Sequence, residues 1–532
     1  MTPPHRTAPR RAASPIPSRL VIASTAALIA ALLAGCQHSA ADASADSGRS
    51  ARSSASVGSG APAADAVLAA DADKVVATLD PRFGSYNIEM VEVTGGTFWK
   101  PYDSGPGKVV RPPIDLTSTK LRNLAKALGP AYIRVSGSWA NSTYFDPDGA
   151  AGATAPEGFE SVLTGDQWKG VGDFARAVDG LVVTSFASSP GAFDAAGVWK
   201  PDQARLLLQY SKDHDVPVYA AELFNEPSLN LGMPPGYDAA AFARDFATLE
   251  RLAEEVAPDL KLAGPGAVED VTPIAIPAQL AAEDMVSRLR GRFDVFSYHF
   301  YPKVSERCSS KEGPDVALTS EFLSRVEVDK SFYERLRDAY EPGDPMWVTE
   351  TAEAACGGDR WASTYRDVIR YVDNLGRLGD GDVVFHNTLA ASDYGLLDED
   401  GLVPRPDYWA AVLWARLMGP KVLAVKSDSA VPDLSVYAHC TAGRKGSVTY
   451  AVVNSSTTAS RTVATASGKS SVHLLTSSSL DSSAIELNGR VLEAKGDGTI
   501  PALDGRPAEG AVEVPPASVA FVSADVSGAA CN

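Results

Sequence analysis

Short apolar runs alternate with amphipathic segments along most of the chain. Eight runs rich in β-branched and aromatic residues lie at residues 85–91, 131–135, 181–186, 218–224, 260–263, 295–300, 346–350 and 383–389. Between them, apolar residues recur every three or four positions, which predicts helices at residues 118–128, 201–214, 239–256, 321–340 and 361–378. Strands that alternate with helices form parallel βαβ units, and eight such units predict an α/β fold, a closed (β/α)8 TIM barrel. A doubly wound sheet gives a similar alternation and is the alternative.

The pattern changes after Met418. Short strand-like runs follow at residues 422–425, 434–439, 447–453, 462–466, 472–475, 484–487 and 512–514, separated by Ser, Gly, Asp and Pro, with no helical period. This predicts a C-terminal β-sandwich domain of about 110 residues. We therefore place the barrel at residues 73–420, with its first residues able to add a strand to the sandwich, and the sandwich at residues 421–532.

The first 36 residues have the pattern of an export signal. Four arginines precede an apolar run at residues 20–33, which is too short for an ordinary membrane-spanning helix. The run ends in Leu-Ala-Gly-Cys, which resembles a bacterial lipoprotein box and predicts cleavage before Cys36 and lipidation of that cysteine. A plain secretory signal with a chance cysteine is the alternative, and Arg10 and Arg11 leave twin-arginine export as another.

Residues 37–72 are almost all Ser, Ala, Gly, Asp and Arg, a composition that predicts a flexible tether. The protein is then lipid-anchored to the bacterial cell envelope, most simply the outer membrane, with no other membrane contact. If the lipid is not attached, it is periplasmic or secreted. We expect a monomer.

The charge balance restricts the partners. The chain has 48 Lys and Arg residues against 66 Asp and Glu residues, a net charge of -18, and removal of residues 1–35 takes away four arginines and no acid, which leaves -22. A surface of this sign argues against nucleic acid as a partner. A local pocket with suitable donors can still hold an acidic sugar.

Four cysteines remain if Cys36 carries a lipid. An even number in an oxidising compartment predicts two disulfides, with three possible connectivities. Their positions in the two predicted domains favour Cys308 with Cys356 and Cys440 with Cys531. Four free buried thiols are the alternative.

Two glutamates follow apolar strands of the predicted barrel, whose active sites lie at the C-terminal strand ends. Asn225 and Glu226 follow the fourth strand, and Glu350 ends the seventh. A carboxyl group at such a position is costly to desolvate unless it has a partner. Paired carboxyls can divide the roles of proton donor and nucleophile, as glycoside hydrolysis requires. A structural ion pair could account for one such glutamate at a strand end. It accounts less well for two of them, on the fourth and seventh strands.

Four segments occur in a distinctive order. They are residues 121–147, containing Leu-Gly-Pro-Ala-Tyr-Ile-Arg; residues 222–227, Glu-Leu-Phe-Asn-Glu-Pro; residues 347–358, Trp-Val-Thr-Glu-Thr with a later Gly-Gly; and residues 393–409, with Asp-Tyr-Gly-Leu-Leu-Asp and Pro-Asp-Tyr-Trp. In order and spacing these segments resemble glycoside hydrolase family 79, the heparanase and β-glucuronidase family of the clan A retaining glycosidases.

The resemblance implies that Glu226 is the acid/base and Glu350 the nucleophile of a double displacement with retention. Asn225 is placed to hydrogen-bond the sugar 2-hydroxyl, with a loop-capping role as its alternative. The resemblance also implies that backbone N–H groups of Gly357 and Gly358, with Tyr394, bind the uronate carboxylate. Backbone donors suit this task because a carboxylate accepts several N–H bonds. Since Cys356 precedes these glycines, a disulfide to Cys308 is expected to shape the pocket.

Further candidates for substrate binding lie at other strand ends: His299 and Tyr301 after the sixth strand, Glu89 after the first, and Ser138 and Asn141 after the second. The alternative for His299 is a buried histidine that makes its hydrogen bonds within the core and does not contact substrate. Lys303, Arg307, Lys311 and Arg360 follow the sixth and seventh strands, where they either recognise anionic groups on further sugars or are solvated surface charges. The histidines and cysteines have no metal-binding spacing, so we expect no metal and no cofactor.

Together these features predict a retaining enzyme that cleaves β-linked glucuronic acid, from a uronate-containing glycan or a small β-glucuronide. A clan A glycosidase for neutral sugars, such as a xylosidase, is one alternative. A glycan-binding surface lipoprotein without catalysis is another, although the presence of both glutamates and Asn225 argues against it.

Overall fold

The computed structural model describes residues 64–102, 107–152, 154–271, 278–381, 383–426 and 431–532. The predicted signal, Cys36 and most of the predicted tether lie outside these residues. Residues 62–532 form one compact unit. No helix in the part of the chain that is described has the length and apolar character needed to cross a membrane.

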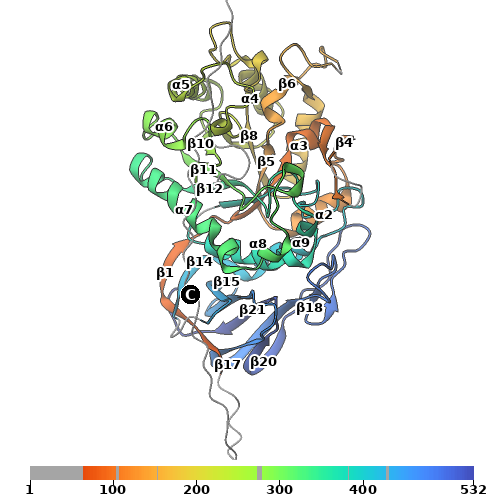
Figure 1. Ribbon diagram of the computed structural model, residues 1–532, viewed down its shortest axis with the longest axis vertical. Helices are drawn as coiled ribbons and strands as arrows, with labels where there is room; N and C mark the ends of the chain where they lie inside the picture. The colour runs from red at the N-terminus through yellow and green to blue at the C-terminus, as the bar shows by residue number, and fades with distance from the viewer. Residues whose placement is uncertain (1–63, 103–106, 153, 272–277, 382, 427–430) are drawn as a thin grey trace, which may run out of the picture. The chain divides into compact units, whose positions relative to one another are not determined.

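Eight parallel strands close into a barrel (Figure 1). In barrel order they are β2 (Gly84–Glu89), β5 (Ala131–Ser136), β8 (Gly180–Ser185), β9 (Val218–Glu222), β10 (Lys261–Ala267), β11 (Val295–Phe300), β12 (Met346–Thr351) and β13 (Val383–His386). Strand β13 pairs with β2 in parallel, which closes the sheet. All eight predicted runs are strands of this barrel, so the TIM barrel is confirmed and the doubly wound sheet is excluded.

Helices surround the barrel strands (Figure 1). The predicted ones are α2 (Thr119–Ala127), α4 (Asp202–Asp213), α5 (Ala239–Val256), α7 (Ser320–Tyr340) and α8 (Tyr365–Arg377); α3 (Gly165–Ala177), α6 (Ala282–Arg288) and α9 (Pro406–Leu417) complete the ring. Helix α5 illustrates the local cause. Asp238 caps its N-terminus by accepting hydrogen bonds from Ala240 and Ala241, and Phe242 and Phe246 are buried on its inner face.

The interior of the barrel is filled by side chains. One cluster joins Tyr132, Val183, Ala220, Trp347 and Phe385, each from a different strand. The rings of Tyr132 and Trp347 have centroids 4.5 Å apart. These residues precede the C-terminal ends of their strands, so the polar residues that follow lie above a packed apolar floor.

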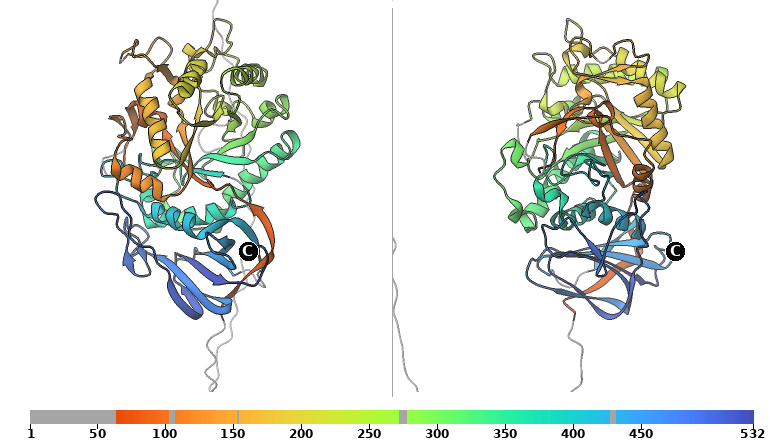
Figure 2. Two further views of the ribbon diagram at one scale, coloured as in Figure 1. Left: turned by 180° about the vertical axis from the view of Figure 1, so that it is seen from behind. Right: turned by 90° about the vertical axis from the view of Figure 1, so that its right-hand side faces the viewer.

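A second domain is a nine-stranded, mainly antiparallel sheet (Figure 2). In sheet order its strands are β1 (Ala66–Thr78), β14 (Met418–Lys426), β15 (Leu434–Thr441), β16 (Ser447–Asn454), β21 (Ser518–Asp525), β17 (Arg461–Thr476), β18 (Glu486–Leu487) and β19 (Arg490–Val491), with β20 (Arg506–Val514) paired to β17. The predicted runs at residues 462–466 and 472–475 are one strand, β17. Strand β21 was not predicted, although it is buried in the middle of the sheet.

The predicted tether is wrong over its last residues. Strand β1 begins at Ala66, pairs with β14 and also with β17, and buries Leu68 to 2% exposure. The Ser- and Ala-rich composition does not reveal this strand because its partners lie more than 300 residues away in the sequence. The two disulfides pair Cys308 with Cys356 and Cys440 with Cys531, as predicted.

Candidate active site

Glu226 and Glu350 meet at the C-terminal end of the barrel. Glu226 lies just after β9 in a left-handed backbone conformation (φ 49°, ψ 55°), directly before Pro227, and Glu350 lies in β12. A carboxylate oxygen of one lies within 4.8 Å of a carboxylate oxygen of the other. Retaining glycosidases hold their two carboxyl groups about 5–5.5 Å apart, and inverting ones about 6.5–9.5 Å apart. The 4.8 Å limit applies to one pair of oxygens, and it places the two carboxyl groups close enough to act on one glycosidic bond.

Glu226 is in a setting that favours the protonated carboxyl group. Burial raises its pKa to about 7, with Arg134 acting against this shift and Glu222 adding to it. The Glu226 side chain is 14% exposed and one oxygen, Oε1, lies 3.0 Å from His299 Nδ1. A carboxyl group with this pKa can act as an acid and then as a base near neutral pH.

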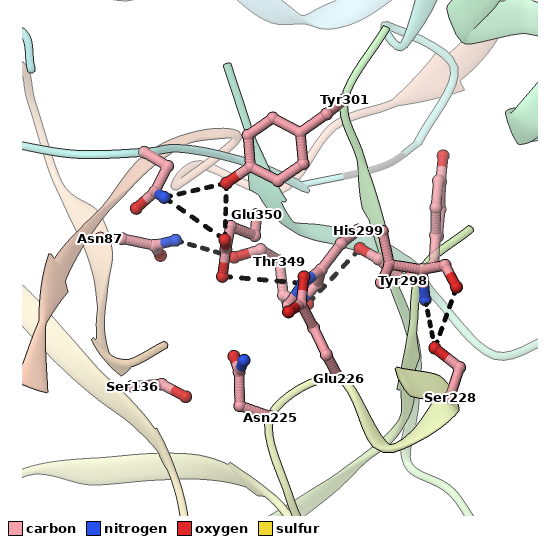
Figure 3. Close-up of polar contacts among 12 residues, drawn as sticks. Asn87, Ser136, Asn225, Glu226, Ser228, Tyr298, His299, Tyr301, Thr349 and Glu350 are labelled. Carbon is pink, nitrogen blue, oxygen red and sulfur yellow. Dashed lines mark hydrogen bonds and ion pairs between the residues drawn. The ribbon is translucent and has the colours of Figure 1, made fainter. Parts of the chain in front are cut away.

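Glu350 accepts hydrogen bonds from three side chains. Arg134 Nη1 donates to Oε2 at 3.1 Å, and the hydroxyl group of Tyr301 donates to Oε1 at 2.5 Å. Asn387 Nδ2 donates both to Glu350 Oε1 (3.3 Å) and to the Tyr301 hydroxyl (2.9 Å). Figure 3 shows Tyr301 and His299 converging on Glu350 and Glu226. The orientation of the Glu350 carboxyl group is thus defined by these donors.

His299 bridges the two glutamates as a neutral imidazole. Burial lowers its pKa to about 4, although Glu350 acts in the opposite direction. Arg134 Nη2 lies 3.2 Å from His299 Nε2. Since arginine can only donate, Nε2 must accept, which places the ring proton on Nδ1, where it is donated to Glu226. Nδ1 is also 3.6 Å from Glu350 Oε2.

Arg134 connects the polar groups of the site, and the sequence reasoning did not assign it to the site. It is 1% exposed in β5 and donates to Glu222 Oε2 (2.8 Å), Glu350 Oε2 (3.1 Å) and Asn225 Oδ1 (2.7 Å). Burial acts to raise the pKa of Glu222, but Arg134, His299 and hydrogen bonds outweigh it, so that the pKa is lowered. An arginine within an apolar strand has to be paired, and this is the signal that the sequence offered.

Asn141 orients the backbone of Asn225. Its Nδ2 donates to the Asn225 carbonyl oxygen (2.9 Å), and its Oδ1 accepts from the Asn225 N–H (3.1 Å). Together with the bond from Arg134, this leaves Asn225 with a defined backbone and amide orientation. The structure thus gives Asn141 a positioning role, and its direct contact with substrate stays a prediction.

The other predicted residues surround one cleft. Its volume is about 420 Å³, and its lining includes Glu89, Ser138, Glu226, Tyr301, Glu350, Cys356, Asn387 and Tyr394. The lining also includes Lys108, whose Nζ lies 4.4 Å from the ring centroid of Trp99. Gly357 and Gly358 are not among the lining residues but follow Cys356 directly. The cleft brings together candidates from six barrel strands and the loops after them.

Glu89 combines a structural and a site role. Its side chain accepts from the backbone of Glu92 and so caps α1 (Met90–Thr94), while Asn387 Nδ2 donates to its Oε1 at 3.3 Å. Burial and the nearby Glu350 raise its pKa well above the usual range. Gly137 allows this arrangement because a Cβ atom there would lie 1.6 Å from Glu89 Oε2.

The loop after β12 has an unusual backbone. Cys356, Gly357 and Gly358 have φ angles of 64°, 81° and 77°, in the left-handed region. A Cβ atom on Gly357 would lie 2.5 Å from the Cβ of Trp99, and one on Gly358 would lie 2.7 Å from Glu353 Oε1. Both positions therefore require glycine on conformational and on steric grounds.

Two of the four basic residues predicted on this rim are neither solvated nor free. Lys303 is 3% exposed, and its Nζ lies 2.7 Å from Asp359 Oδ2. The side chain of Arg307 is 2% exposed and its Nη2 lies 2.5 Å from Asp393 Oδ2. Both predicted interpretations, recognition of further sugars and surface charge, are wrong for these two residues because the loops after β11 and β12 fold over them.

Glu226, His299 and Glu350 also have the geometry of a three-ligand metal site. Arg134 already places a positive charge 3.1 Å from Glu350 and 3.2 Å from His299. A second cation between these groups is disfavoured by repulsion, and the proton on His299 Nδ1 blocks one ligand atom. The arrangement suits a hydrogen-bonded pair of carboxyl groups better than a metal centre.

Comparison with known proteins agrees with this geometry, although no family model matches the chain. Heparanase-like protein 1 of Arabidopsis thaliana is 27% identical over 384 residues, 67% of each chain. Baicalin-beta-D-glucuronidase of Scutellaria baicalensis is 29% identical over 350 residues, 62% of this chain and 63% of the relative. Heparanase of Bos taurus is 28% identical over 479 residues, 76% of this chain and 84% of the relative.

Solved structures share the fold at low sequence identity. A 4-O-alpha-L-rhamnosyl-beta-D-glucuronidase from Fusarium oxysporum has a TM-score of 0.60 at 13% identity and covers 86% of this chain and 100% of its own. An alpha-L-arabinofuranosidase from Thermotoga maritima has a TM-score of 0.61 at 14% identity, covering 87% and 100%. The sequence relatives and the shared fold confirm the resemblance to the heparanase and β-glucuronidase family and support a clan A glycoside hydrolase.

Proposed function

We propose that the chain is a retaining β-glucuronidase in which Glu226 is the acid/base and Glu350 the nucleophile. The observation that carries this proposal is the pairing of two carboxyl groups whose oxygens lie within 4.8 Å, one with a pKa of about 7 and the other held by three donors. Two glutamates in different environments can take opposite roles at one pH. The heparanases and the baicalin glucuronidase among the relatives support glucuronides as substrates.

The reaction has two steps. Glu350 attacks the anomeric carbon while protonated Glu226 gives its proton to the leaving oxygen, which forms a glycosyl ester on Glu350. Glu226, now ionised, takes a proton from water as the water oxygen attacks the anomeric carbon, and the bond from that carbon to Glu350 breaks. Glu350 leaves as a carboxylate, and two successive inversions release the sugar with its configuration retained. Asn225, oriented by Arg134 and Asn141, contacts the 2-hydroxyl group, where the interaction strengthens as positive charge develops in the transition state.

The experiment is hydrolysis of 4-nitrophenyl β-glucuronide by Glu226→Ala and Glu350→Ala variants. We expect each to lower kcat by several orders of magnitude, because each removes a group that acts in the transition state. Azide should restore product formation with opposite anomeric configurations, β-glucuronyl azide with Glu226→Ala and α-glucuronyl azide with Glu350→Ala.

Glu341→Gln is the matched control, because Glu341 is a buried glutamate bound to backbone N–H groups away from the cleft. Near-normal turnover by both alanine variants, or faster wild-type cleavage of the matching β-xyloside, contradicts the proposal.

We also propose that the protein is exported and anchored through Cys36. Two disulfides are typical of an oxidising compartment. Expression of the full chain with labelled palmitate in a bacterial host should label the wild type and not Cys36→Ser. Equal labelling of both contradicts the anchor and leaves the enzymatic proposal unaffected.

A further inference from the structure

The loops after β11 and β12 are bound to each other along their length. Val304 and Ala355 form a parallel β-bridge, and Ser305 N–H donates to the Ala355 carbonyl oxygen at 3.0 Å. The disulfide between Cys308 and Cys356 joins the same two loops. The backbone at Cys356 is therefore held by contacts from the neighbouring loop as well as by its own strand.

Arg307 lies at the centre of this pair of loops. Its Nη1 donates to the carbonyl oxygens of Cys356 (3.3 Å) and Gly358 (2.6 Å), and its Nη2 donates to Asp393 and to the Lys100 carbonyl oxygen. The guanidinium carbon lies 3.9 Å from the ring centroid of Tyr102. Because its side chain is buried, Arg307 cannot reach a sugar in the cleft directly.

The peptide groups at Cys356–Gly357 and Gly357–Gly358 are both bonded on their carbonyl side. The Cys356 oxygen accepts from Arg307 and from the Ser305 hydroxyl (3.2 Å). The Gly357 oxygen accepts from the Ser392 hydroxyl (2.8 Å) and the Asp393 N–H (3.1 Å). In a trans peptide the N–H points away from the carbonyl oxygen, so the N–H groups of Gly357 and Gly358 point away from these donors.

A hydrogen bond to a carbonyl oxygen polarises the peptide group and makes its N–H a stronger donor. The effect is larger when the donor is charged, as Arg307 is. The cleft itself is lined by several carboxyl groups, among them Glu160, Glu226 and Glu350, and each of them opposes the entry of a uronate carboxylate when it is ionised. A positive charge acting through the peptide groups counters this repulsion without occupying the cleft.

Resting on the proposed function, we propose that Arg307 is the specificity-determining positioning residue for uronates. It holds the Cys356–Gly358 turn and polarises the Gly357 N–H, while Ser392 and Asp393 act in the same way on the Gly358 N–H. Lys108 is the rival source of positive charge, since it lines the cleft and can touch a carboxylate directly.

The test compares two substrates with one leaving group, 4-nitrophenyl β-glucuronide and 4-nitrophenyl β-glucoside. The double variant Arg307→Gln/Asp393→Asn removes the buried charge pair without leaving either charge alone. We expect its ratio of kcat/KM for glucuronide over glucoside to fall about tenfold or more, mainly through KM for the glucuronide. Arg307→Lys should retain part of the ratio because the charge remains.

Controls separate this role from general stability. Arg377→Gln/Asp373→Asn removes another pair, on α8, whose atoms lie 2.6 Å apart, and should leave the ratio unchanged. Ser392→Ala removes one bond to the Gly357 oxygen and should lower the ratio a few-fold, so the idea stays testable if the double variant does not fold.

An unchanged ratio in folded Arg307→Gln/Asp393→Asn, or a loss confined to Lys108→Met, overturns the proposal. If the wild type does not cleave the glucuronide, the proposed function fails instead. The Arg307 proposal is then tested by the inhibition constants of glucuronate and glucose, whose ratio should shift in the same variants.

Discussion

Glu226 and Glu350 are the same residue type, and their different behaviour comes from their neighbours. Glu226 receives a hydrogen bond from a neutral histidine, whereas Glu350 receives bonds from an arginine, a tyrosine and an asparagine. Burial without a strong donor favours the protonated form, and several donors favour the ionised form. The division of roles between proton donor and nucleophile is therefore a property of the surroundings.

This division predicts the pH dependence of the reaction. The pKa of Glu226 is raised to about 7, so this carboxyl group is protonated below that pH and loses its proton above it. We expect kcat/KM for 4-nitrophenyl β-glucuronide to fall as the pH rises through about 7. A 2,4-dinitrophenyl leaving group needs less protonation as it departs. The fall of kcat/KM at high pH should therefore be smaller for the 2,4-dinitrophenyl glucuronide than for the 4-nitrophenyl glucuronide. A fall of equal size for the two substrates contradicts the assignment of Glu226.

The same shift has a consequence for stability. A carboxyl group whose folded-state pKa is raised binds its proton more tightly when folded, so it lowers stability as the pH rises from about 4.5 to about 7. Glu226→Gln removes this effect. We expect the substitution to raise Tm by a few degrees at pH 8 and by much less at pH 5. Thermal unfolding at the two pH values measures this, and a stabilisation that is equal at both contradicts the raised pKa.

At the scale of elements, β5 links the strands that carry the site. Arg134 in β5 bonds Glu222 at the end of β9 and Glu350 in β12 across the barrel. These strands are held by parallel hydrogen bonding to their neighbours, and their polar ends are joined by Arg134 and by Thr349, whose hydroxyl group donates to Glu222 Oε1 at 2.9 Å. The site is thus positioned by the barrel and oriented by buried side chains.

Loss of Arg134 should separate stability from activity. Arg134→Met leaves Glu222 as an uncompensated buried charge, and we expect a loss of about 3–5 kcal/mol in the free energy of unfolding. Adding Glu222→Gln should restore most of that stability. Turnover should stay at least about 100-fold below wild type in both variants because Asn225 Oδ1 loses the donor Arg134 and Glu350 loses one of its three donors. Denaturant unfolding and kcat measure the two effects, and recovery of activity in the double variant contradicts the orienting role.

At the scale of the whole molecule, the two disulfides serve different regions. Cys308 and Cys356 join loops that border the cleft, whereas Cys440 and Cys531 lie in the core of the sheet domain. The barrel and this sheet also share hydrogen bonds, since Tyr365 in α8 donates to the Leu475 carbonyl oxygen at 2.7 Å. We therefore expect the Cys440–Cys531 disulfide to raise the stability of the fold. We expect the Cys308–Cys356 disulfide to affect substrate binding.

Removal of each disulfide checks this difference. The bond between Cys440 and Cys531 spans 91 residues, for which loop-closure entropy gives a stabilisation of about 4–5 kcal/mol. Cys440→Ala/Cys531→Ala should lose stability of that order with kcat unchanged at 25 °C. Cys308→Ala/Cys356→Ala should also raise KM for the glucuronide. Equal KM values in the two double variants contradict the proposed role of the Cys308–Cys356 bond.

Much of the architecture could be predicted because its causes are local. The eight barrel strands, the five predicted helices and both glutamates follow from periodicity and from polar residues at strand ends. A strand added to the sheet domain by the residues that follow the tether was expected, but the start of β1 at Ala66 was not, since the apolar positions of that part have meaning only beside β14 and β17. Arg134 was missed as a site residue, and the burial of Arg307 was not foreseen, for a related reason: their partners come from other strands and loops.

The sequence by itself determined which residues end the barrel strands and which chemistry they can carry, since hydrophobic period and residue type are properties of short segments. Only the tertiary structure decided which of those groups meet. It paired Glu226 with a neutral histidine, gave Glu350 its donors and buried Arg307 beneath the loop after β12. The physical reason is that protonation and orientation depend on distance and burial, which arise when segments far apart in the chain come together.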